Sequence, residues 1–123
     1  MERRVKFIVA EPSYLIRKGI TSIINRIEHA SVIKQVDTLD EINSTILKYT
    51  PDFLVLNLNL LSHLNTFRNS NIKLDLVTKG IAINTGNSEE LLHDVNFREV
   101  INLGDTKNEI FENISPSIWA NMT

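Results

Sequence analysis

Cysteine is missing from this chain, and long apolar runs are missing too. Without cysteine there can be no disulfide framework, no thiolate metal site and no thiol nucleophile. The apolar run nearest the N-terminus, residues 7–10, falls far short of a signal-peptide core or of the roughly 20 residues that span a membrane. We therefore expect no membrane association. The absence of cysteine is compatible with the reducing cytosol, where we expect the protein to act.

An excess of charge of one sign is also missing. The chain has 13 Lys and Arg against 15 Asp and Glu, for a formal net charge of −2. Such a balance gives this segment no electrostatic reason to bind nucleic acid by itself. A small basic group at Arg3, Arg4 and Lys6 is more often solvated than functional. With 123 residues, 42% of them hydrophobic, the chain is expected to form one domain around a single core.

Short apolar runs alternate with amphipathic stretches along the chain. The runs predict strands at residues 5–10, 31–36, 53–57, 81–85 and 100–103. The amphipathic stretches predict helices at residues 13–28, 38–49, 62–69, from about residue 87, and from about residue 106. The spacing of Thr38 to Glu41 and of Thr106 to Glu109 predicts capping boxes at the start of the second and the last of these helices. Residues 72–77 are interpreted as an extended connector or a strand extension. Five βα units in succession predict a parallel sheet with helices on both faces and right-handed crossovers.

Some local features make sharper predictions. The stripe of the first helix consists of Leu15, Ile16, Ile20, Ile23, Ile24 and Ile27. Pro51 is expected to hold Thr50 in an extended conformation, and Pro116 to end or kink the last helix. The isolated Trp119 is interpreted as a local packing anchor.

The carboxyl ends of parallel strands meet at one edge of the sheet, where ligands and chemistry are found in open α/β sheets. The loops after the first, third, fourth and fifth strands begin near Glu11, Asn57, Thr85 and Leu103. Asn57 follows the continuously apolar residues 53–56, so its strand is expected to be buried on both faces. What Asn57 can do at that edge is the central question about this chain.

These places carry a resemblance to a known family. The chain resembles the receiver domain of two-component response regulators, in the branch that carries a LuxR/NarL-type DNA-binding domain. The matching stretches are residues 7–9 with 15–20 (including Arg17-Lys18-Gly19), residues 51–59 and residues 83–85. The resemblance covers about residues 5–115. It implies an α/β fold, a three-layer αβα sandwich whose five-stranded parallel sheet has the flavodoxin-like order 2-1-3-4-5.

The resemblance also implies a chemistry. In that family an aspartate at the end of the third strand attacks a phosphoryl donor, and two acidic residues after the first strand help it to hold Mg²⁺. A Thr or Ser after the fourth strand and a Lys after the fifth contact the phosphoryl oxygens. The carboxylate is the nucleophile, while the metal and the ammonium group offset the charge that builds on the phosphoryl group.

This sequence departs from the family pattern at nearly every one of those positions. The nucleophile position carries Asn57, and the acidic pair falls on Glu11 and Pro12. The lysine position falls on Leu103, or on Asn102 if the loop shifts by one residue. The aromatic switch position of the fifth strand falls on Val100. Only Thr85 fits its role, as the residue at the switch position.

The hypothesis that follows is a degenerate receiver, or pseudo-receiver, that does not transfer phosphoryl groups and is not an enzyme. We expect no cofactor and weak or absent Mg²⁺ binding. Partners would be proteins or a second copy, bound through the helical faces that the family uses, the fourth and fifth helices or the first and fifth. DNA would be bound only by an output domain expected beyond residue 123, as in a bacterial transcription regulator.

Alternatives stay open. Asn57 can be a hydrogen-bonded residue that closes the sheet edge without any part in signalling. The chain can be an orthodox phosphoacceptor that uses Asp52, Asp37 or Asp105, although none is well placed. It can also be a flavodoxin-type ligand-binding domain, but residues 11–13 lack a phosphate-binding loop because Pro12 has no N–H donor. The three histidines, at positions 29, 63 and 93, have no metal-ligand spacing.

Overall fold

The computed structural model describes residues 4–61, 78–84 and 97–122. Its five strands are β1 (Val5–Ala10), β2 (Ala30–Val36), β3 (Phe53–Asn57), β4 (Lys79–Asn84) and β5 (Glu99–Asn102). They form one parallel sheet in the order β2-β1-β3-β4-β5. The predicted strand order is confirmed, and β2 lies at an edge of the sheet.

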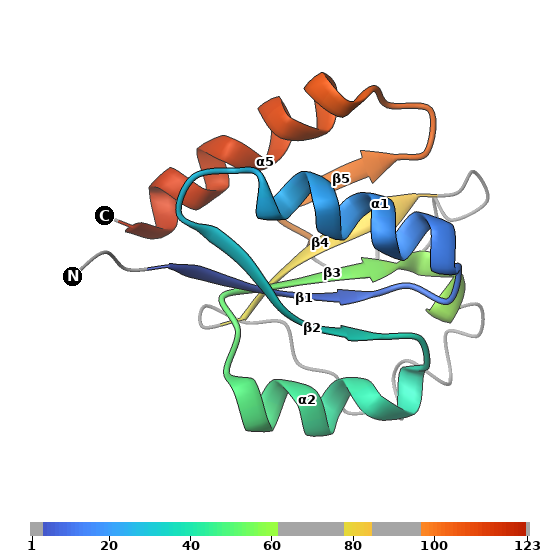
Figure 1. Cartoon of the computed structure of the whole chain (residues 1–123). Coiled ribbons are helices and arrows are strands. Elements are labelled where there is room, and N and C mark those ends of the chain that lie inside the picture. The colour runs from blue at the N-terminus through green and yellow to red at the C-terminus, as the bar shows by residue number, and fades with distance from the viewer. Residues whose placement is uncertain (1–3, 62–77, 85–96, 123) are drawn as a thin grey trace.

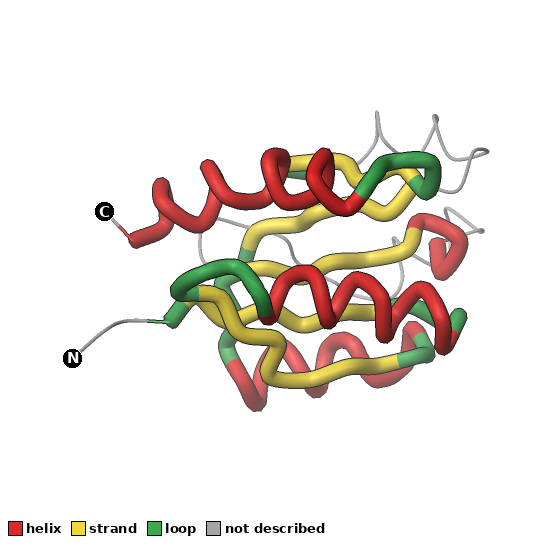
Figure 2. Tube along the Cα trace, turned by 45° about the horizontal axis from the view of Figure 1, so that its top comes forward, coloured by secondary structure: helices red, strands yellow, loops and turns green. Residues whose placement is uncertain are grey.

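Helices cover both faces of this sheet. The α-helices are α1 (Tyr14–Asn25), α2 (Ile42–Tyr49) and α5 (Lys107–Met122), and short 3-10 helices are η1 (Leu39–Glu41) and η2 (Leu58–Leu61). Figure 1 shows α1 and α5 on one face and α2 on the other, and the turned view of Figure 2 shows the same layers. The three-layer αβα architecture is confirmed. The helices predicted at residues 62–69 and from residue 87, and the connector at 72–77, lie outside the described residues.

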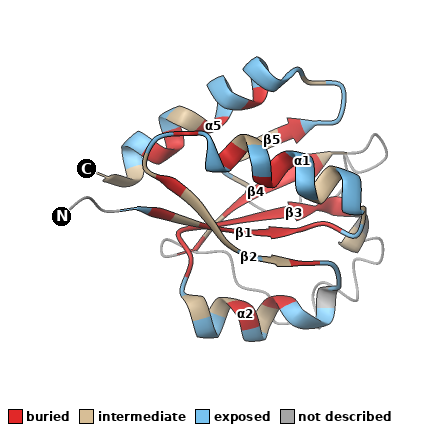
Figure 3. Ribbon diagram, in the orientation of Figure 1, coloured by how far each residue is buried: buried red, intermediate tan, exposed pale blue. Residues whose placement is uncertain are grey.

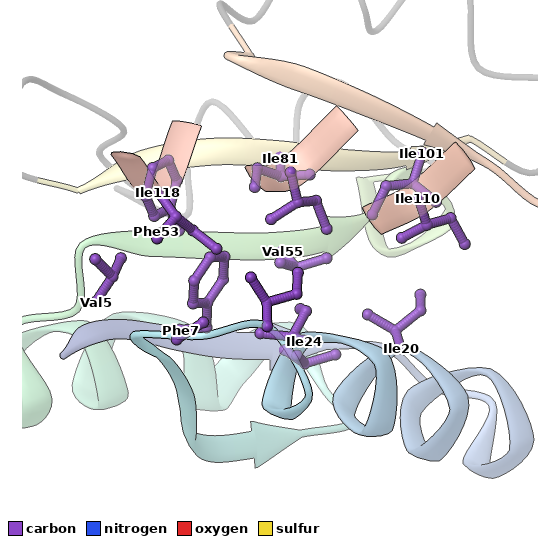
Figure 4. Packing of buried hydrophobic residues seen from close by; sticks show 14 of the residues in the cluster. Val5, Phe7, Ile20, Ile24, Phe53, Val55, Ile81, Ile101, Ile110 and Ile118 are labelled. Atoms are coloured by element: carbon purple, nitrogen blue, oxygen red, sulfur yellow. The ribbon is translucent and has the colours of Figure 1, made fainter. Parts of the chain in front are cut away.

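The two central strands of the described sheet, β1 and β3, are buried along almost their whole length (Figure 3). On the α1 and α5 side, the rings of Phe7 and Phe53 stack with their centroids 5.0 Å apart. Isoleucines from both helices close over them, including Ile24 and Ile114 (Figure 4 shows this cluster). On the other side, Ile42 of α2 packs with the alternate residues of the same strands. Fully apolar strands are thus covered from both faces.

The helix α1 begins one residue later than predicted, with Ser13 as its cap. The Oγ of Ser13 accepts a hydrogen bond from the N–H of Ile16, at 3.4 Å. The predicted stripe is wrong at Leu15, which is 81% exposed. At about 100° per residue, Leu15 is rotated well away from the line of Ile20 and Ile24, so it cannot reach the core with them.

The prediction for Thr50 is also wrong. Thr50 adopts the left-handed conformation, with φ 42° and ψ 61°, and its N–H donates to the carbonyl of Ile46 at 2.9 Å. Pro51 excludes the right-handed helical region for the residue before it. The left-handed cap obeys that restriction, and its N–H makes the last i→i−4 bond of α2.

Pro116 does not end the last helix, which continues to Met122. The buried side chains of Ile114 and Ile118 lie on either side of the proline and pack into the same cluster. Beyond it, the Lys79 ammonium group at the start of β4 donates to the side-chain oxygen of Asn121. Tertiary contacts therefore hold the last turns helical and outweigh the hydrogen bond that Pro116 removes.

The capping box predicted at the start of the last helix is confirmed. The N–H of Thr106 donates to Oε1 of Glu109 at 3.0 Å, and the N–H of Glu109 donates to the Thr106 hydroxyl at 3.2 Å. The start of α2 differs, because η1 precedes it and Glu41 takes the cap position without a side-chain cap bond. In the ranges that the structure describes, no helix has the length and apolar character needed to cross a bilayer.

The contrast between Leu15 and Ile24 can be tested by two matched substitutions in α1. Ile24→Ala should lower the free energy of unfolding by about 3 kcal/mol, because it opens a cavity in the core. Leu15→Ala should change it by less than about 0.5 kcal/mol, as expected for an exposed position. Urea unfolding measures both. Equal losses in the two variants would contradict the burial of this helix.

The capping box predicts a pH effect. Hydrogen bonds from the backbone and hydroxyl of Thr106 hold the pKa of the Glu109 carboxyl below its ordinary value. Because the pKa is lower in the folded chain, this contribution to stability is present above the unfolded pKa and is lost as the pH falls through the folded pKa. Thr106→Ala should raise the pKa of Glu109, measured by NMR titration. Thr106→Ser should leave it low. Because Thr106→Ala keeps the backbone N–H, its rise should be partial, and an unchanged pKa would contradict the contribution of the hydroxyl.

Candidate functional site at the carboxyl edge of the sheet

The pairing of β1 with β3 brings Glu11 and Asn57 together. Ala10 pairs with Leu56 in the parallel register, so the next residue of each chain segment lies at the carboxyl edge of the two central strands. Glu11 is 0% exposed and Asn57 is 3% exposed. A polar pair is therefore buried at the edge where α/β sheets place their ligands.

The side chains of this pair are hydrogen-bonded to each other. Nδ2 of Asn57 donates to Oε1 of Glu11 at 2.5 Å and to Oε2 at 3.0 Å. The N–H of Ser13 donates to Oε2 at 3.3 Å. A buried carboxylate needs such donors, because burial without them costs several kcal/mol. The amide of Asn57 thus stabilises the buried carboxylate of Glu11, as a bound cation would otherwise do.

The backbone of Glu11 is held just as firmly as its side chain. Its N–H donates to the carbonyl of Val36 at 3.0 Å, and its carbonyl accepts from Nη1 of Arg17 at 2.7 Å. The Arg17 guanidinium also lies over the ring of Tyr14, 5.6 Å from its centroid. From the sequence we predicted Ser13 as the helix cap, which is confirmed, but not the bonds of Arg17 and of the Ser13 N–H to Glu11. The signal was available, since both belong to the first turns of the helix that follows Glu11.

The position beside Glu11 contributes no charge. Pro12 is exposed, has neither a carboxylate nor an N–H group, and separates Glu11 from the cap of α1. The part of the chain that the structure describes holds no group of three His, Cys, Asp or Glu side chains arranged to hold a metal. Mg²⁺ is usually bound through one or two carboxylates, and the single carboxylate here is already bonded to an amide, so the pair offers that ion a weak site.

The other predicted site positions lie farther along the edge. Leu103 is 50% exposed, and its N–H donates to the carbonyl of Asn84 at 3.3 Å. Asn102 accepts from Nδ2 of Asn84 at 3.1 Å, and its N–H donates to Oδ2 of Asp105 at 2.9 Å. Neither the Leu103 nor the Asn102 side chain carries a positive charge. The edge of β4 and β5 is therefore tied together by amide and backbone hydrogen bonds.

Two predicted positions remain. Thr85 lies outside the described residues, so its role as a switch residue stays a prediction. Val100 is partly buried and packs against the core cluster on the α2 side. It has no ring to swing between two positions as an aromatic residue could.

Two of the three acidic candidates, Asp52 and Asp105, are separated from this pair. The third, Asp37, is exposed and follows β2 at the same carboxyl edge, where Val36 pairs with Ala10 and accepts from the N–H of Glu11. Asp52 precedes β3 and so lies at the amino end of the strand whose carboxyl end carries Asn57. It is buried, and its Oδ2 accepts from the N–H of Lys6 at 2.8 Å. Asp105 bonds in the turn after β5. The structure places neither of them beside Glu11.

The histidine and tryptophan predictions concern packing. His29 lies edge-on to Trp119, with ring centroids 5.7 Å apart, and so joins the loop before β2 to the end of α5. Trp119 is still 56% exposed, so it anchors through one side only. His63 and His93 lie outside the described residues.

A substitution at Asn57 tests the site. Asn57→Asp replaces an amide donor by a second buried carboxylate facing Glu11, and should lower the free energy of unfolding by about 3 kcal/mol at neutral pH without divalent cations. Denaturant unfolding measures the loss.

The matched control exchanges the two groups. The double variant Glu11→Gln with Asn57→Asp keeps one amide facing one carboxylate, so it should recover most of the lost stability. If Asn57→Asp is as stable as the parent chain, the hydrogen bond is not holding this edge.

Known proteins resemble this chain in structure. A scan against models of protein families and a search of curated protein sequences find no match. The two-component response regulator of the LuxR family from Aurantimonas sp. SI85-9A1 matches with a TM-score of 0.76 and 13% identity, over 95% of this chain and 86% of that chain. The response regulatory domain of protein mrkE from Klebsiella pneumoniae matches with a TM-score of 0.73 and 13% identity, over 95% and 97%.

The signal receiver domain of the response regulator NarL from Mycobacterium tuberculosis has a TM-score of 0.67 and 14% identity, over 89% of this chain and 92% of that chain. At identities this low, the structural matches support a shared fold and not a shared activity. The resemblance that the sequence suggested is confirmed at that level: this chain has the fold of the receiver domains of response regulators.

Proposed function

We propose that this chain is a pseudo-receiver, a signalling domain of the two-component type that acts by protein contact and not by aspartyl phosphorylation. The observation that carries the proposal is the hydrogen bond from Asn57 to Glu11. It lies where the receiver chemistry would need a nucleophilic carboxylate and a cation. In this proposal the domain is regulatory and cytoplasmic, and it is not an enzyme.

Three losses support this proposal together. An amide nitrogen has no anion with which to attack phosphorus, so Asn57 cannot form an acyl phosphate. Pro12 leaves Glu11 as the one acidic side chain of the expected pair. Leu103 brings no ammonium group to offset charge on a phosphoryl oxygen. If only the nucleophile had been replaced, the second acidic residue and the lysine of the family pattern would still be present.

Dimerisation is the partner interaction that we favour. One matched structure is of two RcsB dimers bound to two parallel DNAs, and another is of RcsB bound to promoter rprA. In this chain α1 and α5 lie on the same face of the sheet (Figure 1). The sequence of α1 contains Arg17 and Lys18 and no acid, whereas exposed Glu109 and Glu112 lie on α5. A second copy turned by a twofold axis could pair these charges.

Transcription regulation is the output that we propose. DNA would then be contacted by an output domain and not by this segment, whose net charge is −2. The orthodox alternative would require another acceptor, and Asp52 is engaged at the amino end of β3. The flavodoxin-type alternative would require N–H donors after β1, where Pro12 has none.

Phosphorylation can be tested directly. The chain incubated with acetyl phosphate and Mg²⁺ should keep its intact mass, because Asn57 cannot attack and Mg²⁺ has one engaged carboxylate to bind. Mass spectrometry of the whole protein at neutral pH is the measurement. An added phosphoryl group at any residue would overturn the proposal.

A control shows whether the loss lies in one residue. Asn57→Asp restores a nucleophile but neither the second acid nor the lysine, so it should remain unmodified. Adding Pro12→Asp and Leu103→Lys restores the family set and is the positive control for the donor. Phosphorylation of Asn57→Asp alone would show that the rest of the site is still competent.

A further inference from the structure

A concavity of about 360 Å³ lies between α2 and the edge strand β2, on the face of the sheet opposite α1 and α5. Its lining residues come from β2, η1 and α2, and they are Lys34, Glu41, Ser44, Thr45, Lys48 and Tyr49. It shares no residue with the site at Glu11 and Asn57. Its volume lies in the range of small-molecule sites, about 300–1,000 Å³.

Two hydroxyl groups of α2 line this concavity. The lining residues of α2 recur at spacings of three and four, so they share one side of the helix. Thr45 is buried, and its hydroxyl donates to the carbonyl of Glu41 at 2.6 Å, while the Ser44 hydroxyl donates to the same carbonyl at 3.1 Å. Each hydroxyl oxygen can still accept a hydrogen bond from a ligand.

The charge of the lining is unequal. Lys34 on β2 and Lys48 on α2 both line the concavity, together with a single carboxylate, that of Glu41, and all three residues are exposed. Within residues 4–61, 78–84 and 97–122, neither lysine forms an ion pair with a carboxylate. Lys48 lies over the ring of Tyr49, 5.3 Å from its centroid. The concavity therefore carries a net positive charge that the described chain does not neutralise.

We propose that this concavity binds a small hydroxylated dianion, whose phosphate or paired carboxylates bridge Lys34 and Lys48 while its hydroxyl donates to Glu41. Bonds between ammonium groups and anionic oxygens are the strong, charge-assisted kind. Glu41 would disfavour a bare anion and favour one that carries a donor. Lys34, Lys48 and Glu41 together therefore favour an anion that carries a hydroxyl group over one that does not.

Such a ligand would act on the core through α2. Ile42 and Ile46 pack against a cluster that includes Leu54 and Leu56 of β3, the strand that ends in Asn57. Binding between α2 and β2 could therefore shift the packing of the central strands without a covalent phosphate. This role rests on the proposed function. The binding itself is measured without any phosphodonor, so the ligand site and the pseudo-receiver function can each be refuted separately.

The test is an NMR titration of the isotope-labelled whole chain with glycerol 3-phosphate, which is a phosphate monoester, and with malate, which is a dicarboxylate. Saturable shifts are expected at Lys34, Ser44, Thr45 and Lys48, and the tighter of the two probes identifies the head group. Sodium chloride at equal ionic strength should not reproduce them. Failure of both probes to bind, or the same shifts with chloride, would overturn the proposal.

Variants separate this site from general charge effects. Lys34→Gln and Lys48→Gln should each weaken binding by about tenfold, whereas Lys107→Gln, on α5, should leave it unchanged. Glu41→Gln should strengthen the binding of sulfate, which has no donor, because a repulsion is removed. If Glu41 had only a structural role, its replacement would weaken the binding of sulfate and not strengthen it. Equal affinity in the parent, Lys34→Gln and Lys48→Gln proteins would place the anion elsewhere and refute the site.

Discussion

The parallel pairing of β1 with β3 is the constraint on which the rest of this structure depends. Its register stacks Phe7 on Phe53 at the start of the strands and brings Glu11 to Asn57 at their end. The first contact builds the core, and the second closes the edge that a receiver uses for chemistry. Both follow from one alignment, and a shift of one residue would turn every side chain of β3 to the other face.

In the proposed function, the pair at that edge maintains the fold without the receiver chemistry. A buried carboxylate without a donor or cation is costly, so Glu11 needs a partner wherever the sheet is maintained. Asn57 provides N–H donors without bringing a second negative charge. Stability and phosphotransfer make opposite demands on this position, because a nucleophile must be an anion and a donor to Glu11 must not. Here the demand of stability is met.

The two faces of the sheet present different surfaces. On one face α1 and α5 present opposite charges around a large apolar cluster, and on the other α2 borders a concavity lined by two lysines and one glutamate. The central strands belong to both clusters, since alternate side chains point to opposite faces. In the proposed function, a ligand at α2 and a partner at α1 and α5 would therefore communicate through the same strands.

The sequence by itself determined the class of fold, the strand order through its resemblance, the capping box at Thr106, and the fact that Asn57 and Glu11 meet at one edge. These depend on local periodicity and on the rule that parallel strands share an edge. Only the tertiary structure decided the rest. Burial determined which residues of α1 face the core. The left-handed Thr50 and the continuous α5 depend on the tertiary structure around them. The hydrogen bond from Asn57 to Glu11 depends on side-chain geometry.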